Sequence, residues 1–206
     1  MDVKKRVGIM GGTFNPIHLG HMLAGENACE NFDLDEVLFV PSGNVEKKRE
    51  IIDPKIRISL LGDAIEDNAH FALSTQEVDR KGNAYSYRTV ADLKKKNPLT
   101  EYYYICGADR LFHWDRWDEP EKLFAEVPIL VAPRYNKHTD EELQAKIAEL
   151  KEKYNANIQI IPMSEVNISS TDIRDKVAQG KSLRYIVHYR VVEDIKKYKL
   201  FLPDEE

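Results

Sequence analysis

Short runs rich in β-branched and aromatic residues alternate with helix-like segments along the whole chain. Strands that alternate with helices predict a parallel sheet with helices on both faces. The expected strands are Arg6–Met10, Glu36–Val40, His70–Gln76, Glu101–Cys106, Pro128–Ala132 and Asn157–Ile161. Because we find no internal repeat, low-complexity tract or linker, we expect one α/β domain over residues 1–206, with a doubly wound, mostly parallel sheet.

The segments between the expected strands carry apolar residues at helical spacing. Expected helices cover His18–Asn31, Pro54–Asn68, Tyr87–Lys96 and Ser169–Gln179, and one more surrounds Val191 and Ile195. Thr139 and Glu142 have the spacing of a capping box that begins a further helix. Gly180 stands at the position that favours glycine after a helix end.

Composition restricts the environment in which the chain works. Hydrophobic residues make up 42% and charged residues 32% of the 206 positions, which is ordinary globular usage. The longest apolar stretch, Val127–Pro133, is far shorter than the roughly 18 residues of a membrane span, so we expect no membrane partner. Cys29 and Cys106 lack the spacing of metal ligands, so we expect buried free thiols and a reducing, cytoplasmic location.

The net charge of −5 argues against a nucleic-acid partner. An anionic ligand would instead need local positive groups. Three clusters supply them, namely His18 with His21, Lys47-Lys48-Arg49, and Arg174. In open parallel sheets, ligands bind beyond the carboxyl ends of the strands, where the strand order reverses. The candidate segments for a site are therefore those that follow Met10, Val40, Cys106 and Ile161.

The first expected strand runs directly into Gly11-Gly12-Thr13-Phe14-Asn15-Pro16-Ile17-His18-Leu19-Gly20-His21. Paired glycines let backbone amides approach a ligand, and a helix that begins near His18 offers free amides and a favourable dipole to an anion. His18 and His21 project to the same side of the first helical turn. This pattern predicts a phosphate cradle with two proton donors, although it is neither a P-loop nor the three-glycine dinucleotide fingerprint. A plain glycine turn with two surface histidines is the alternative.

A second polar run, Asn167-Ile168-Ser169-Ser170-Thr171-Asp172-Ile173-Arg174, follows the last expected strand. Three consecutive hydroxyl residues at a helix start offer side-chain and backbone donors together, which suits a polyphosphate. Arg174 lies one turn into the helix and adds a planar cation. Taken alone, this run is equally compatible with an ordinary helix cap.

Together the two runs resemble the signatures of the nucleotidyltransferase superfamily, and most closely those of bacterial nicotinate-nucleotide adenylyltransferases. The resemblance extends over essentially the whole chain and implies a Rossmann-like nucleotidyltransferase fold. It implies ATP binding by Gly11, Gly12, Thr13, Phe14, Ile168, Ser169, Ser170 and Thr171, and catalytic roles for His18, His21, Lys48 and Arg174. The chain departs from the family at Asn15, which is usually Asp, and at Val45-Glu46-Lys47-Lys48, which is usually Pro-Pro-His-Lys.

The middle of the chain continues the resemblance. Gly107-Ala108-Asp109 matches the family's Gly-Ala-Asp, which implies that Gly107 and Asp109 lie near the adenosine. Tyr85-Ser86 belongs to a segment similar to Ser-Tyr-Thr-x-x-Thr, whose backbone recognises the nicotinate carboxylate in relatives. Trp117 falls where relatives place a Trp that stacks on the pyridine ring; the alternative for it is a core or rim aromatic, which is what we expect Trp114 to be. Lys47, Ser86 and Trp117 are thus the expected acceptor-binding residues.

The resemblance implies transfer of AMP from ATP to nicotinate mononucleotide, which gives deamido-NAD and pyrophosphate. Mg²⁺ would arrive with ATP, since we find no carboxylate cage for a metal of the protein's own. Two alternatives stay open: a related adenylyltransferase that acts on nicotinamide mononucleotide or phosphopantetheine, and a non-catalytic nucleotide sensor. The sequence also leaves open whether the chain forms a homo-oligomer.

Overall fold

The computed structural model describes residues 4–43, 51–80, 85–114, 119–134 and 138–203. In this part of the chain, six strands form one sheet in the order β3-β2-β1-β4-β5-β6, and every neighbouring pair is parallel. The strands are β1 (Arg6–Gly12), β2 (Glu36–Pro41), β3 (Phe71–Leu73), β4 (Glu101–Gly107), β5 (Ile129–Ala132) and β6 (Ile158–Ile160). The predicted doubly wound parallel sheet is confirmed.

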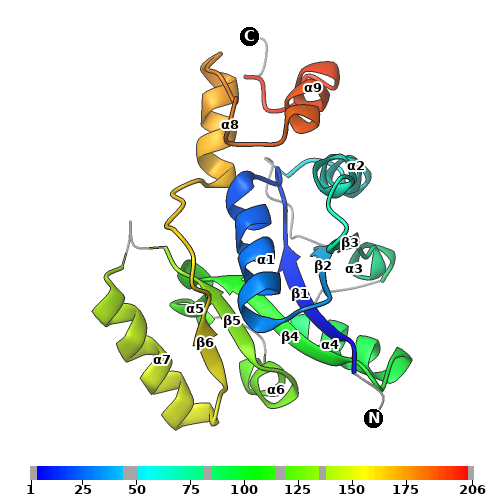
Figure 1. Ribbon diagram of the computed structural model, residues 1–206. Coiled ribbons are helices and arrows are strands. Elements are labelled where there is room, and N and C mark those ends of the chain that lie inside the picture. Colours follow the sequence, from blue (N-terminus) through cyan, green and yellow to red (C-terminus); the bar gives the residue numbers. More distant parts are fainter. Residues whose placement is uncertain (1–3, 44–50, 81–84, 115–118, 135–137, 204–206) are drawn as a thin grey trace.

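Helices cover the sheet on both sides (Figure 1). One buried cluster contains side chains of α1 (Leu19–Phe32), α2 (Pro54–Ile65), α8 (Ser170–Ala178) and α9 (Tyr189–Lys197). The other contains side chains of α4 (Ser86–Lys96), α5 (Ala108–Leu111), α6 (Pro120–Glu126) and α7 (Asp140–Tyr154). The helices α8 and α9 lie at the top of Figure 1, beyond the end of β1.

The central strands are mainly apolar after their first residues because both of their faces are buried. Successive side chains of a strand point to opposite faces, so Ile9 belongs to one core cluster and Met10 to the other. Tyr104 and Ile105 of β4 divide between the two clusters in the same way. This is the pattern expected of a parallel sheet covered on both sides, and it explains why continuous apolar runs mark these strands in the sequence.

Helix ends follow the capping residues seen in the sequence. At the start of α7, Thr139 Oγ1 accepts from the Glu142 amide at 3.2 Å, and the Glu142 carboxylate accepts from the Thr139 amide at 2.8 Å. The predicted capping box is therefore confirmed. Ser169 Oγ caps α8 by accepting from the Asp172 amide at 3.0 Å. Gly180, just beyond α8, has a φ of 64°, as a residue in the left-handed region after a helix should.

Two expectations about boundaries were wrong, and three short helices were missed. The strand expected over His70–Gln76 is limited to Phe71–Leu73, because β3 lies at the sheet edge and pairs only with β2. Gln76 instead begins the short helix α3 (Gln76–Asp79). The helix expected to reach Asn68 ends at Ile65. The short helices α3, α5 and α6 were not predicted, since four to seven residues hold too few turns to show an apolar period.

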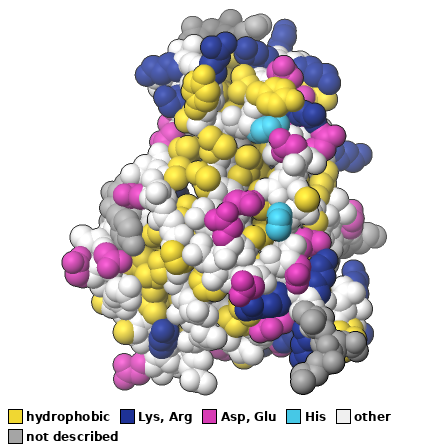
Figure 2. All heavy atoms as spheres, viewed as in Figure 1, with side chains coloured by type: hydrophobic (Ala, Val, Ile, Leu, Met, Phe, Trp, Pro, Cys, Tyr) yellow, Lys and Arg dark blue, Asp and Glu magenta, His cyan; other side chains and the backbone are white. Residues whose placement is uncertain are grey.

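Two global properties bear on the environment and on the ligand. Cys29 and Cys106 are buried free thiols, as expected, and no helix among the described residues is long and apolar enough to cross a membrane. Although the net charge is negative, Lys and Arg side chains gather over α8 and α9 at the top of Figure 2. The basic residues of this region include Lys176, Lys181, Arg184, Arg190, Lys196 and Lys197. A positive potential at this end attracts anions.

Candidate active site

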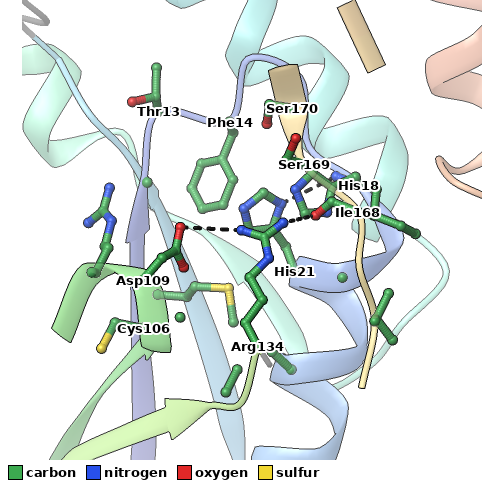
Figure 3. A pocket seen from close by; sticks show the side chains of 18 of the residues that line it. Thr13, Phe14, His18, His21, Cys106, Asp109, Arg134, Ile168, Ser169 and Ser170 are labelled. Atoms are coloured by element: carbon green, nitrogen blue, oxygen red, sulfur yellow. Dashed lines mark hydrogen bonds and ion pairs between the residues drawn. The ribbon is translucent and has the colours of Figure 1, made fainter. Parts of the chain in front are cut away.

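A cavity of about 370 Å³ opens where the strand order reverses, at the carboxyl ends of β1 and β4 (Figure 3). This is the position at which doubly wound sheets bind their ligands. The predicted site residues that line it are Gly11, Gly12, Thr13, Phe14, His18, His21, Gly107, Asp109, Ile168, Ser169, Ser170, Thr171 and Arg174. The two signatures, which lie near opposite ends of the sequence, therefore share one cavity.

The paired glycines are required by the protein's own packing as well as by access for a ligand. A Cβ atom on Gly11 would lie 2.7 Å from Tyr104 Oη, and one on Gly12 would lie 2.9 Å from Cζ of Phe14. Phe14 itself is buried and has a φ of 47°, a left-handed conformation that is strained for an aromatic residue. Strained backbone of this kind concentrates at functional sites. Here the left-handed conformation of Phe14 accompanies a contact between its ring and His21.

His18 and His21 form a stacked pair. Their ring centroids are 3.7 Å apart with an interplanar angle of 26°. The Phe14 ring makes a T-shaped contact with His21, with centroids 5.0 Å apart. His18 is the N-cap of α1, and its backbone amide donates to Nδ1 of His21 at 3.3 Å. Since Nδ1 accepts this bond, neutral His21 carries its proton on Nε2. The expectation that both rings lie on the same side of the helix start is confirmed.

Both imidazoles are neutral at physiological pH. Burial, together with the nearby Arg134 guanidinium, lowers the pKa of His18 to about 4. Burial and the neighbouring His18 lower the pKa of His21 well below its ordinary value. Each ring therefore offers one N–H to a ligand rather than a full positive charge. Donors of this kind stabilise negative charge that develops during a reaction.

Acid should destabilise the protein through His18. The pKa of His18 is about 4 in the folded protein, whereas a histidine in the unfolded chain has a pKa of about 6.5. As the pH falls, the unfolded chain therefore takes up the proton first. Stability therefore falls as the pH drops from about 6.5 towards 4. For this residue we expect a loss of about 2 kcal/mol between pH 7 and pH 5.

Urea unfolding at the two pH values measures this loss. The loss should shrink in His18→Gln and should be unchanged in His70→Gln, which alters an exposed histidine. An identical pH dependence in wild type and His18→Gln would show that His18 is not the responsible group.

Arg134 is a site residue that the sequence did not reveal. It follows β5, and its guanidinium pairs with Asp109 at 3.3 Å and donates to the Ile168 carbonyl (Figure 3). It thus links the segment after β4 to the second signature across the cavity. The available signal was a cation placed directly after a strand end, in Ala132-Pro133-Arg134. Arg110, adjacent to Asp109, also lines the cavity and was likewise not predicted.

The second signature contacts the first directly. Ser170 Oγ donates to the Pro16 carbonyl at 2.8 Å, and Arg174 Nη1 donates to the Asn15 carbonyl at 3.0 Å. Ser169 Oγ is engaged within the cap of α8, where it also donates to the Asp172 carboxylate at 2.5 Å. The first amides of a helix have no partner within it. The backbone at the start of α8, together with Arg174, is therefore what this signature offers to an anion.

The predicted acceptor residues lie apart from the cavity lining or outside the described residues. Ser86 begins α4, and its hydroxyl lies 3.0 Å from Tyr104 Oη, the atom that packs against Gly11. Ser86 is thus next to β1 without lining the cavity. Lys47, Lys48 and Trp117 lie outside the described residues, so their roles stay predictions. Trp114, expected to be a core or rim aromatic, is fully buried and belongs to the core.

Comparison with known proteins agrees with this geometry. Residues 9–176 match the family model described as cytidylyltransferase-like. A relative from Lachnoclostridium phytofermentans, named "Probable nicotinate-nucleotide adenylyltransferase", is 41% identical over 200 residues, which are 96% of this chain and 100% of the relative. The chain belongs to this family. A second family member, from Thermoanaerobacter sp., is 36% identical over 212 residues, 100% of this chain and 99% of the relative.

Solved structures show the nicotinate-nucleotide adenylyltransferase fold at lower identity. The chain resembles Plasmodium falciparum nicotinic acid mononucleotide adenylyltransferase complexed with NaAD, with a TM-score of 0.78 and 20% identity. That match covers 96% of this chain and 97% of the other. The same enzyme complexed with APC gives a TM-score of 0.76. The Rossmann-like nucleotidyltransferase fold is confirmed.

Proposed function

We propose that the protein transfers AMP from ATP to nicotinate mononucleotide, giving deamido-NAD and pyrophosphate. The observation that carries the proposal is the neutral, stacked pair of His18 and His21 in a cavity at the switch point of the sheet, in a chain of this family. The retained pair argues against a nucleotide sensor that has lost its chemistry. The free thiols of Cys29 and Cys106 fit the reducing cytoplasm, where we place the enzyme.

In the proposed reaction, a phosphate oxygen of the acceptor attacks the α-phosphorus of ATP. The new P–O bond forms as the bond from the α-phosphorus to its bridging oxygen breaks, and pyrophosphate leaves with the electron pair. His18 and His21 donate to the oxygens that gain charge at the α-phosphorus. Arg174 and the first amides of α8 hold the departing pyrophosphate. Because positioning and charge stabilisation suffice, no nucleophilic side chain is needed.

Mg²⁺ would reach the site bound to the phosphates of ATP, with most of its other ligands being water. Among the described residues, no group of three or more His, Cys, Asp and Glu side chains is arranged to hold a metal. Asp109, the carboxylate drawn in Figure 3, is paired with Arg134. In this proposal the ion arrives with ATP.

The acceptor should be strongly preferred in its acid form. The helix α4 begins at Ser86, and the amides and dipole at a helix start favour a carboxylate. The carboxamide N–H groups of nicotinamide mononucleotide would face the backbone N–H groups at the start of α4, and donors on both sides would be left without an acceptor. We expect kcat/KM to be roughly tenfold or more higher for nicotinate mononucleotide.

Pyrophosphate release from ATP with each acceptor in turn measures this preference. Phosphopantetheine is included as the acceptor of a related adenylyltransferase. Comparable values for the acid and amide mononucleotides would refute the role of α4, and faster turnover with phosphopantetheine would replace the proposed function.

A further inference from the structure

Arg57 is a fully buried cation outside the predicted site. It lies on α2 with 0% of its surface exposed. Its guanidinium donates to three backbone carbonyls: Thr13 at 2.8 Å, Ser42 at 2.8 Å and Ile52 at 3.3 Å. Burial lowers the pKa of Arg57, but a guanidinium keeps its charge in proteins. The three carbonyl dipoles and the negative charge of Asp53 compensate in part for the lost hydration of this charge.

The three carbonyls belong to three segments around the cavity. Thr13 lies in the glycine turn after β1 and lines the cavity. Ser42 follows β2, and Ile52 precedes α2, so these two residues stand on either side of residues 44–50, which include Lys47 and Lys48. One planar side chain therefore fixes the glycine turn relative to both flanks of the lysine-bearing segment.

Asn15 extends the same network to the second signature. It is buried, its Oδ1 accepts from the Ile52 amide at 3.2 Å, and its carbonyl accepts from Arg174 at 3.0 Å. A continuous set of hydrogen bonds thus runs from Arg174 through Asn15 and Ile52 to Arg57. The side chain of Asn15 is used here as an oxygen acceptor, a role that an aspartate could fill equally well.

We propose that Arg57 is a positioning residue for adenylyl transfer, with Asn15 as its partner. This inference rests on the proposed function of the same site. A buried guanidinium often stabilises the fold less than an apolar side chain of similar volume would at the same position. The contribution of Arg57 therefore lies in holding three loops in one arrangement. Loss of that arrangement displaces the glycine turn, which lines the cavity, relative to Ser42 and Ile52. Small misplacements in a phosphoryl-transfer site reduce the rate sharply.

Steady-state kinetics of Arg57→Met and Arg57→Lys test the proposal, with Leu61→Ala as the matched control. Leu61 is fully buried on the same helix, so its truncation destabilises α2 without removing the three hydrogen bonds. At a temperature where every variant is folded by circular dichroism, Arg57→Met should lose roughly tenfold or more in kcat. Arg57→Lys should lose less, and Leu61→Ala should stay near wild type. Equal kinetics for Arg57→Met and Leu61→Ala would overturn the proposal.

Two further measurements keep the test decisive. If Arg57→Met does not fold, Asn15→Ala should show the same loss of kcat, and Asn15→Asp, which keeps the oxygen, should lose less. Calorimetric binding of a non-reactive ATP analogue needs no acceptor, and it should weaken about threefold in Arg57→Met but not in Leu61→Ala. A wild type that is inactive with nicotinate mononucleotide would refute the proposed function, whereas unchanged analogue binding in Arg57→Met would refute the role of Arg57.

Discussion

Replacement of His21 by alanine should lower kcat by roughly 100-fold or more, and His18→Ala should do the same. Nδ1 of His21 is already engaged by the amide of His18, so Nε2–H is the donor left for the reacting phosphate. His18 is neutral and stacks on His21, which orients both rings before any substrate arrives. The loss of one such preorganised donor raises the barrier by about 2.7–4 kcal/mol in comparable sites.

The measurement is kcat at saturating ATP and acceptor, combined with calorimetric binding of a non-reactive ATP analogue. Analogue binding should persist in both variants, because the glycine turn and the start of α8 are unchanged. His70→Ala, which alters an exposed histidine outside the cavity, should keep wild-type kinetics. A folded His21→Ala protein with near-normal kcat would remove that histidine from the mechanism.

The two tryptophans should separate stability from acceptor binding. Trp114 is 0% exposed and stacks on Phe124 with ring centroids 4.6 Å apart, inside the core cluster that joins α4, α5, α6 and α7. Trp114→Ala should therefore lower the free energy of unfolding by about 3–5 kcal/mol. Trp117→Ala should instead raise the KM for the acceptor about three- to tenfold and leave the KM for ATP unchanged, because one stacking partner contributes about 0.5–1.5 kcal/mol beyond its buried area.

Urea unfolding and steady-state kinetics on both variants distinguish the two roles. The expected outcome is a stability defect confined to Trp114→Ala and an acceptor defect confined to Trp117→Ala. The reverse assignment would mean that the alignment of this segment of the sequence with the family is displaced by three residues.

The strands and long helices were predictable because the forces that form them leave local patterns. A strand buried on both faces must be apolar at successive positions such as Ile9 and Met10, and a helix such as α7 is delimited by its own capping residues. The short helices were not predictable in this way. The helix α5 has four residues and begins directly after β4, so its conformation depends on tertiary packing of Ala108 and Leu111 rather than on a repeating pattern.

The same distinction separates the site residues that could be predicted from the sequence from those that could not. The two signatures were predictable because glycine pairs, nearby histidines and a run of hydroxyl residues are unusual at strand ends. Arg57 was not, because it acts through backbone carbonyls such as that of Thr13, 44 residues away. Arg134 follows a strand end, but its partners, the Asp109 carboxylate and the Ile168 carbonyl, lie 25 and 34 residues away. A backbone carbonyl has no residue type, so no pattern of letters marks it as the partner of an arginine.

The hydrogen bonds from Ser170 to Pro16 and from Arg174 to Asn15 join positions 154 and 159 residues apart. Synthesis proceeds from the N-terminus, so the glycine turn leaves the ribosome long before its partners in α8 have been made. A nascent chain cannot close the cavity until Arg174 emerges. A nucleotide that binds in the cavity can therefore stabilise only chains that have completed their fold. By mass action, this stabilisation increases with the concentration of the nucleotide in the cell.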